Sequence, residues 1–195
     1  MPSPPMARLI LFNKPYGVIT QFSPSGGKAT LKHFIPLPGF YPAGRLDTDS
    51  EGLLLLSDEP ELNERLLHPR HGHKRIYWAQ VERVPETAAL AKLASGPMVQ
   101  GRKALPCRAW LLDPQPEVPP RDPPIRFRKK VATAWIGLEL TEGKNRQVRR
   151  MTAAIGHPTL RLIRVQIGMY TLPGDLGPGT WKELSVTERA LVRGS

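Results

Sequence analysis

The sequence predicts an α+β protein, built on a mixed, mostly antiparallel sheet with helices and loops packed around it. Three observations lead to this class. The chain has 195 residues, the size of one typical domain, so we expect a single domain over residues 1–195, in one or two lobes. Strand-like and helix-like segments are interleaved without the regular strand–helix–strand repeat of a doubly wound fold. The 22 prolines and 17 glycines predict many loops between these elements.

The first third of the chain contains two expected strands and a polar loop. An apolar strand at 8–12 ends at 13–17 (NKPYG), where proline and glycine favour a turn before β structure resumes at 18–20. A short helix is expected at 31–34. The loop 43–52, polar and bounded by glycine, runs directly into an apolar strand at 53–57 and therefore borders the core.

In the middle of the chain the spacing of apolar residues changes several times between a strand-like and a helix-like period. Residues 74–84 are rich in aromatic and β-branched residues and predict a strand. A helix at 86–94 should end at Gly96, before a further β region that ends near residue 112. The segment 113–130 holds six prolines and five basic residues, which favours an extended basic arm over a sheet centre.

The last third predicts two strands around a basic helix. Alternating apolar residues indicate strands at 131–142 and 159–167, the second with Ile163, Val165 and Ile167 inward. Between them, Asn145 is a suitable N-cap and Gly156 a suitable stop for a helix. Apolar Val148, Met151 and Ile155 fall on one side of this helix. Three arginines fall on the other: Arg146, Arg149 and Arg150.

The charge of the chain favours a polyanionic partner. With 28 Lys and Arg against 17 Asp and Glu, the net charge is +11, so nucleic acid is the first candidate through counterion release. The apolar runs, such as 53–56, fall far short of the roughly 20 residues of a membrane span, and no signal peptide is apparent. We therefore expect a cytoplasmic protein without a membrane partner. Cys107 is the only cysteine, which excludes intrachain disulfides, and is expected to be a half-buried apolar side chain.

Two features carry candidate chemistry, and each has an ordinary structural alternative. Asp47, in Gly-Arg-Leu-Asp beside Arg45, lies in a loop where aspartate is most often a turn former. A neighbouring arginine can nevertheless keep such a carboxylate ionised, as a nucleophile or base requires. The arginines of the 145–156 helix are commonly a solvated face, but the planar guanidinium suits phosphates.

Several motifs together resemble one known family. The segments GRLDTDSEGLLLLSDE, NKPYGVIT, KRIYWAQV and EGKNRQVRRMTAAIGHPTLRLIRVQIG occur in order over roughly residues 8–172. They closely resemble the RsuA/RluB/RluE/RluF family of ribosomal RNA pseudouridine synthases. The resemblance implies the pseudouridine synthase fold, a bent sheet crossed by an active-site cleft. Most relatives carry an N-terminal S4 RNA-binding domain, which we do not expect here because the first core motif begins near residue 9.

The resemblance also implies roles for three residues. Asp47 would be the nucleophile that converts a specific uridine of 23S rRNA to pseudouridine in a flipped-out nucleotide, without a cofactor. Tyr77 would stack on the target base, although a core aromatic of a strand is the alternative. Arg149 would pair with Asp47, with Lys144 as the alternative partner.

Basic residues around these motifs are the candidates for RNA contact. They are Lys14, Arg45, Lys144, Arg146, Arg150, Arg161, Arg164 and the arm 121–130. No metal is expected at His68, His71 and His73, because thiolates and a suitably spaced carboxylate are lacking. We expect a monomeric rRNA isomerase; the alternative is a non-catalytic RNA-binding ribosome assembly factor on the same fold.

Overall fold

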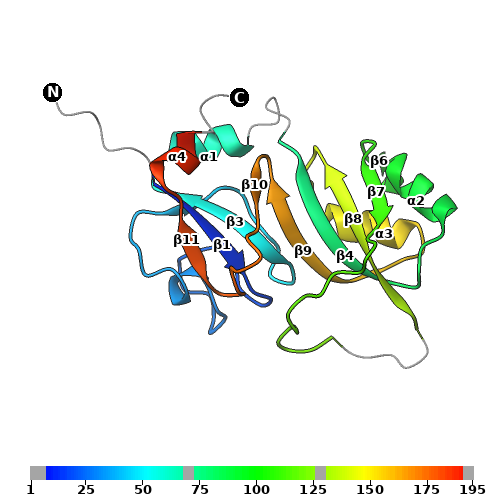
Figure 1. The fold of residues 1–195 in the computed structure, drawn as a ribbon, viewed down its shortest axis with the longest axis horizontal. Helices are drawn as coiled ribbons and strands as arrows, with labels where there is room; N and C mark the ends of the chain where they lie inside the picture. The colour runs from blue at the N-terminus through cyan, green and yellow to red at the C-terminus, as the bar shows by residue number, and fades with distance from the viewer. Residues whose placement is uncertain (1–7, 68–72, 126–130, 191–195) are drawn as a thin grey trace. The chain divides into compact units, whose positions relative to one another are not determined.

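The computed structural model describes residues 8–67, 73–125 and 131–190, and the chain divides into two compact units (Figure 1). Unit 1 comprises residues 1–73 and 168–195, and unit 2 comprises residues 74–167. Unit 1 is therefore built from two stretches of chain, whereas unit 2 is one continuous stretch. Each unit has its own strands and its own hydrophobic core.

The sheet of unit 1 has β1 (Leu9–Lys14) between β3 (Glu51–Ser57) and β11 (Trp181–Glu183). Strand β2 (Tyr41–Pro42) pairs with the end of β3, and all three pairings are antiparallel. Every residue of β1 and β3 is buried. The predicted strands at 8–12 and 53–57 are confirmed. β1 ends two residues later than predicted and β3 begins two residues earlier, because the pairing of Lys14 with Gly52 continues the ladder into the flanking turns.

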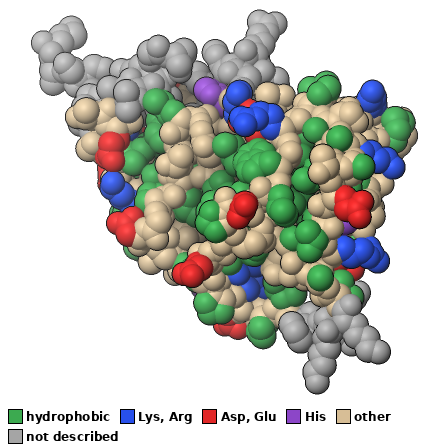
Figure 2. Space-filling model, turned by 45° about the vertical axis from the view of Figure 1, so that its right-hand side comes forward, with side chains coloured by type: hydrophobic (Ala, Val, Ile, Leu, Met, Phe, Trp, Pro, Cys, Tyr) green, Lys and Arg blue, Asp and Glu red, His purple; other side chains and the backbone are tan. Residues whose placement is uncertain are grey.

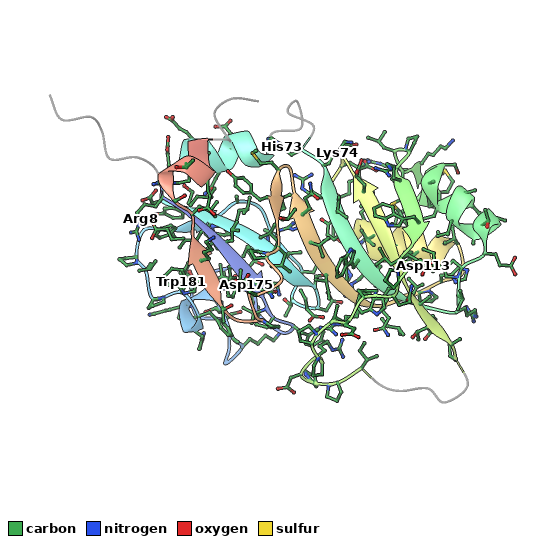
Figure 3. All side chains as sticks on the ribbon, in the orientation of Figure 1. Arg8, His73, Lys74, Asp113, Asp175 and Trp181 are labelled. Carbon is green, nitrogen blue, oxygen red and sulfur yellow. The ribbon has the colours of Figure 1, made fainter. Side chains whose placement is uncertain are left out.

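The core of unit 1 lies between this sheet and a short helical turn. Phe12 and Leu54 pack with Leu31 of the 3-10 helix η1 (Leu31–His33), which confirms the short helix expected there. Trp181, labelled in Figure 3, donates its indole N–H to the Phe34 carbonyl at 3.1 Å and so ties β11 to this turn. The remaining elements of unit 1 are α1 (Pro60–Leu67), β10 (Tyr170–Thr171) and α4 (Val186–Ala190).

The sheet of unit 2 is antiparallel, in the order β9-β4-β8-β7. Its strands are β4 (Arg75–Glu82), β7 (Arg108–Leu111), β8 (Thr133–Leu140) and β9 (Thr159–Ile167). The helices α2 (Thr87–Ala94) and α3 (Gln147–Ala154) contribute Leu93 and Met151 to the same core cluster as Ile136 of β8. A separate hairpin is formed by β5 (Met98–Val99) and β6 (Arg102–Lys103).

Two glycines of unit 2 allow close packing. Gly137 of β8 lies under the indole of Trp110, where a Cβ would approach the ring to 2.2 Å. Gly96 ends α2 with a φ of +79°, as expected for a glycine stop, and its neighbour there is the Ala104 carbonyl.

The structure corrects two expectations for the last third of the chain. Four consecutive residues of β9, Arg161 to Arg164, are buried, whereas strict alternation was expected; both arginines are covered, and the pairing with β4 contains two register shifts. Asn145 is not the N-cap of α3. That position is Arg146, with a left-handed φ of 52°, because the Asn145 side chain instead accepts a hydrogen bond from Arg150.

The proline-rich segment 113–125 contains no helix or strand, and its expected basic end, 126–130, lies outside the described residues. Gln115 nevertheless fixes this segment to β8. Its side-chain oxygen accepts the Trp135 N–H at 2.6 Å, and its amide donates to the Trp135 carbonyl at 3.1 Å. The described part of the arm is thus ordered by contacts within the protein. Throughout residues 8–67, 73–125 and 131–190, no helix is long and apolar enough to cross a membrane.

Candidate active site

Asp47 lies in unit 1, in the loop between β2 and β3. Its side chain is half-buried, between exposed Arg45 and Thr48. The turn closes through a 3.0 Å hydrogen bond from the Ser50 N–H to the Asp47 carbonyl. Directly after this turn the chain enters the buried strand β3, so the carboxylate sits on a short connection to the most completely buried part of the sheet.

A second loop holds the Asp47 loop in place. The Thr20 hydroxyl donates to the Leu46 carbonyl at 2.7 Å, and the Gly17 N–H donates to the Thr48 carbonyl at 2.8 Å. Gly17 has a φ of 83°, which only glycine adopts readily. This backbone conformation lets the predicted turn at 13–17 direct the Gly17 N–H toward the Asp47 loop. The backbone on both sides of Asp47 is therefore fixed by Gly17 and Thr20, two residues of the NKPYGVIT motif.

Lys14 stabilises that turn from inside the protein. It is fully buried, and its ammonium donates to the Val18 carbonyl at 2.8 Å and to the Pro15 carbonyl at 3.0 Å. We expected Lys14 to contact RNA, and this geometry argues against a direct phosphate contact. The burial of Lys14 could not be inferred from the segment Asn-Lys-Pro-Tyr-Gly alone, because it depends on which carbonyls the fold brings to the ammonium.

Tyr77 lies on β4 of unit 2, with Ala79 and Val81 on the face that contributes to the core, as expected. Its partner in the antiparallel ladder is Arg164 of β9. Burial lowers the pKa of the Arg164 guanidinium, and a hydrogen bond and charge interaction with Tyr77 oppose that effect. Arg164, expected to touch RNA, is thus an interior residue that contacts the candidate base-stacking tyrosine.

Arg149 lies on α3 and is half-buried. Its guanidinium donates to the Thr159 carbonyl at the start of β9, at 3.2 Å. Next to it, the hydroxyls of Thr152 and Thr159 are 2.7 Å apart, which joins the helix to the same strand. The position of Arg149 is therefore set by packing of α3 on the sheet through Val148 and Met151.

Arg161 also has an interior role. It is 5% exposed, donates to the Pro119 carbonyl at 2.8 Å, and lies 5.9 Å from the centre of the Trp135 ring. This arginine holds the proline-rich segment against β8, which argues against the direct RNA contact expected for it.

The other expected RNA contacts are at the surface. Arg45, Lys144 and Arg146 are exposed, and Arg150 is half-buried. The ammonium of Lys144 lies 3.1 Å from Glu142 Oε2. Which of Arg149 and Lys144 pairs with Asp47 stays a prediction. The sequence analysis did not predict a role for Glu142 and Gln147, whose side chains form a hydrogen bond at the start of α3. Both residues belong to the EGKNRQ segment of the family motif, which could have indicated them.

The structure thus distributes the expected catalytic residues over both units. Tyr77 and Arg149 belong to unit 2, and Asp47 belongs to unit 1. The predicted pairing of Asp47 with Arg149 and the predicted cleft remain predictions. Cys107 is half-buried as expected, and burial and the charge of Glu142 raise the pKa of its thiol to about 11.

The surface charge and the candidate ligands for metals can be assessed for the described ranges. The face drawn in Figure 2 carries basic, acidic and apolar side chains intermixed, without one continuous basic patch. No three His, Cys, Asp or Glu side chains in these ranges are grouped to hold a metal ion; His68 and His71 lie outside them.

The comparison with known proteins identifies the class. Residues 8–154 match the family described as RNA pseudouridylate synthase. The chain belongs to this family, whose members are isomerases. A solved structure, "Crystal structure of pseudouridylate synthase", superposes with a TM-score of 0.78 at 26% identity over 96% of this chain and 74% of the other. The expected α+β pseudouridine synthase fold is confirmed.

Among its relatives, the chain is similar to two named proteins. It is 50% identical to the ribosomal large subunit pseudouridine synthase E of Xanthomonas campestris pv. campestris, over 89% of this chain and 94% of the relative. It is 44% identical to the protein of the same name from Vibrio parahaemolyticus, over 92% of this chain and 74% of the relative. The resemblance inferred from the motifs is confirmed.

Proposed function

We propose that this protein converts one uridine of 23S ribosomal RNA to pseudouridine, with Asp47 as the nucleophile acting on a flipped-out nucleotide. The observation that carries the proposal is the match of residues 8–154 to the family, supported by relatives named for the large ribosomal subunit. We further propose that it acts as a monomer in the cytoplasm, where its substrate is assembled, and that it needs no cofactor.

The reaction is a balanced isomerisation. The bond between C1′ of the ribose and N1 of uracil breaks, and a bond between C1′ and C5 forms. The proton on C5 is lost to solvent and N1 acquires one, so nothing is oxidised or reduced. A group that attacks the nucleotide must be an ionised, fixed side chain with access to it. Asp47 is half-buried on a loop whose backbone carbonyls accept three hydrogen bonds that hold it in place, which supports this role.

The remaining residues would bind and orient the nucleotide. Tyr77 would stack on the extruded base. Its ring packs against the core and its hydroxyl interacts with Arg164, and these two contacts would hold the ring in position. Arg149 would keep Asp47 ionised. Arg45, exposed two residues before Asp47, would lie beside the site that the nucleotide leaves. Flipping a base costs a few kcal/mol, which phosphate contacts by Lys144, Arg146 and Arg150 would offset.

The test is tritium release from 23S rRNA labelled with [5-³H]uridine, without added nucleotide or metal. The unmodified protein should release tritium and Asp47→Asn should not, while its RNA affinity stays within several-fold. Asp49→Asn, which removes a carboxylate from the same loop, is the matched control and should remain active. Turnover by Asp47→Asn would disprove the nucleophile. No release by any protein, on naked rRNA and precursor particles, would favour the RNA-binding assembly factor.

A further inference from the structure

Unit 2 contains a pocket that none of the candidate catalytic residues lines. It has a volume of about 420 Å³ and lies between the β5–β6 hairpin and the segment that leads into α3. Four cationic side chains line it: Arg102, Lys103, Lys144 and Arg150. Tyr77 and Arg149, the candidate catalytic residues of the same unit, are not among its lining residues.

The pocket has an excess of positive charge. Its one carboxylate, Glu142, accepts the Leu105 N–H at 2.9 Å and pairs with Lys144 at 3.1 Å. The side chains of Arg102 and Lys103 are exposed, and no carboxylate neutralises them within the lining. An anionic ligand would therefore meet two exposed cations of the hairpin and an ion pair at the opposite wall.

One of the cations is held in a fixed orientation. Arg150 Nη1 donates to Gln100 Oε1 at 2.6 Å, and Nη2 donates to Asn145 Oδ1 at 2.9 Å. Gln100 can reach it because Gln100 and Gly101 both adopt positive φ, 50° and 75°, in the tight turn of the hairpin. The guanidinium plane thus joins the hairpin to α3 and is ordered before any ligand binds, which lowers the entropic cost of binding.

The lining also has the mixed character that a nucleotide requires. Val99 and Ala104 provide apolar surface, and Gln147 adds a buried amide. The volume lies within the range of about 300 to 1,000 Å³ typical of small-ligand sites, which a single nucleotide can fill. Unpaired nucleotides are commonly bound by arginine planes that stack on the base and by cations that contact the phosphate.

We infer that this pocket binds one unpaired nucleotide of the RNA substrate other than the target uridine, with its phosphate on Arg102 and Lys103. The inference rests on the proposed function for the identity of the RNA. It assigns the β5–β6 hairpin as an RNA-binding element that would hold a nucleotide other than the one that reacts.

The first test measures binding of 23S rRNA transcribed in vitro to the full chain between 50 and 300 mM KCl. Lys103→Gln should weaken binding about three- to tenfold and reduce the slope of log Kd against log [salt] by about 1, as expected for one lost phosphate contact. Arg102→Gln/Lys103→Gln should roughly double both effects. Lys92→Gln is the matched control, since Lys92 is exposed in the same unit but does not line the pocket; its Kd should change less than twofold.

A second measurement tests directly whether the rRNA covers Lys103 of the pocket. Acetylation of lysines, followed by mass spectrometry, should show Lys103 protected by the rRNA and Lys92 unprotected. Equal effects of the Lys103 and Lys92 substitutions, or an unprotected Lys103, would overturn the inference. The two proposals fail separately: tritium release with unaltered binding by Lys103→Gln rejects only the pocket, whereas weakened binding without any tritium release rejects only the isomerase.

Discussion

Two groups of arginines in unit 2, on β9 and around the β5–β6 pocket, differ in their burial and in the groups that they contact. On β9, Arg161 and Arg164 are 5% and 4% exposed, and their partners are a carbonyl, an aromatic ring and a tyrosine of the protein. Around the β5–β6 pocket, exposed Arg102 lies beside Arg150, whose guanidinium is held by two amides. The first region uses guanidinium groups to hold the sheet together, and the second presents them at the surface.

The net charge of +11 therefore overstates the charge available to a ligand. Lys14, Arg161 and Arg164 are buried, and Lys14 and Arg161 donate to backbone carbonyls of the protein itself. Substitutions in the two regions should therefore affect different measurements: stability for the buried arginines and RNA affinity for the exposed ones.

The largest effect is expected for Arg164→Ala. It would leave a cavity beside Tyr77 and remove that residue's partner, so the free energy of unfolding should fall by about 3 kcal/mol. Arg164→Met fills much of the same space without a buried charge and should cost less. Urea denaturation measures both. Arg102→Ala is the surface counterpart and should change stability by less than about 0.5 kcal/mol; a similar loss in both regions would remove the distinction between them.

An intermediate effect is expected for Gly137→Ala, which tests the packing of the same sheet. The new Cβ would lie 2.2 Å from the Trp110 ring, so the ring or the strand must move. Overpacking of this kind costs about 1–3 kcal/mol. Thermal unfolding should show a lower Tm together with altered tryptophan fluorescence. Gly143→Ala, where the nearest atom is 3.6 Å away, should show neither change.

The smallest effect concerns Glu142 at the pocket and depends on pH. Burial alone would raise the pKa of Glu142, but hydrogen bonds from Leu105, Lys144 and Gln147 lower it below its ordinary value of 4.5. The unfolded chain therefore takes up this proton at higher pH than the folded chain. The stability that Glu142 contributes is complete above its ordinary pKa and is lost as the pH falls through the lower folded value.

Unfolding free energies measured from about pH 6 to pH 3 should therefore fall less steeply for Glu142→Gln than for the unmodified protein. Glu117→Gln, at an exposed position, should retain the full slope. Identical slopes for all three proteins would mean that the hydrogen bonds to Glu142 do not favour its ionised form.

Much of the fold could be predicted from local pattern. The apolar run at 53–56, the alternation in 133–140 and the aromatic strand at 75–82 each indicate their element without reference to the rest of the chain. The pairing of β1 with β11 could not be predicted, because it joins residues about 170 positions apart and β11 has only three residues.

For the candidate site, local pattern gave the residues, and their catalytic roles stay predictions. Asp47, Tyr77 and Arg149 follow from motifs, and the structure gives each a defined place. The burial of Lys14 and Arg164 could not be predicted, since the sequence does not show which carbonyl or hydroxyl will meet a cation. Asn145 illustrates the same limit: its favourable capping chemistry is used to bind Arg150, and Arg146 adopts the capping position with a left-handed backbone.

The discontinuity of unit 1 has a consequence for synthesis on the ribosome. Unit 2 is one uninterrupted stretch, residues 74–167, so all of its strands can pair as soon as that stretch has emerged. In unit 1, β1 can pair with β3 early, but its other edge remains open until β11, the last strand of the sheet, has been translated. The topology thus imposes an order of assembly in which the first strand made is among the last to be fully paired.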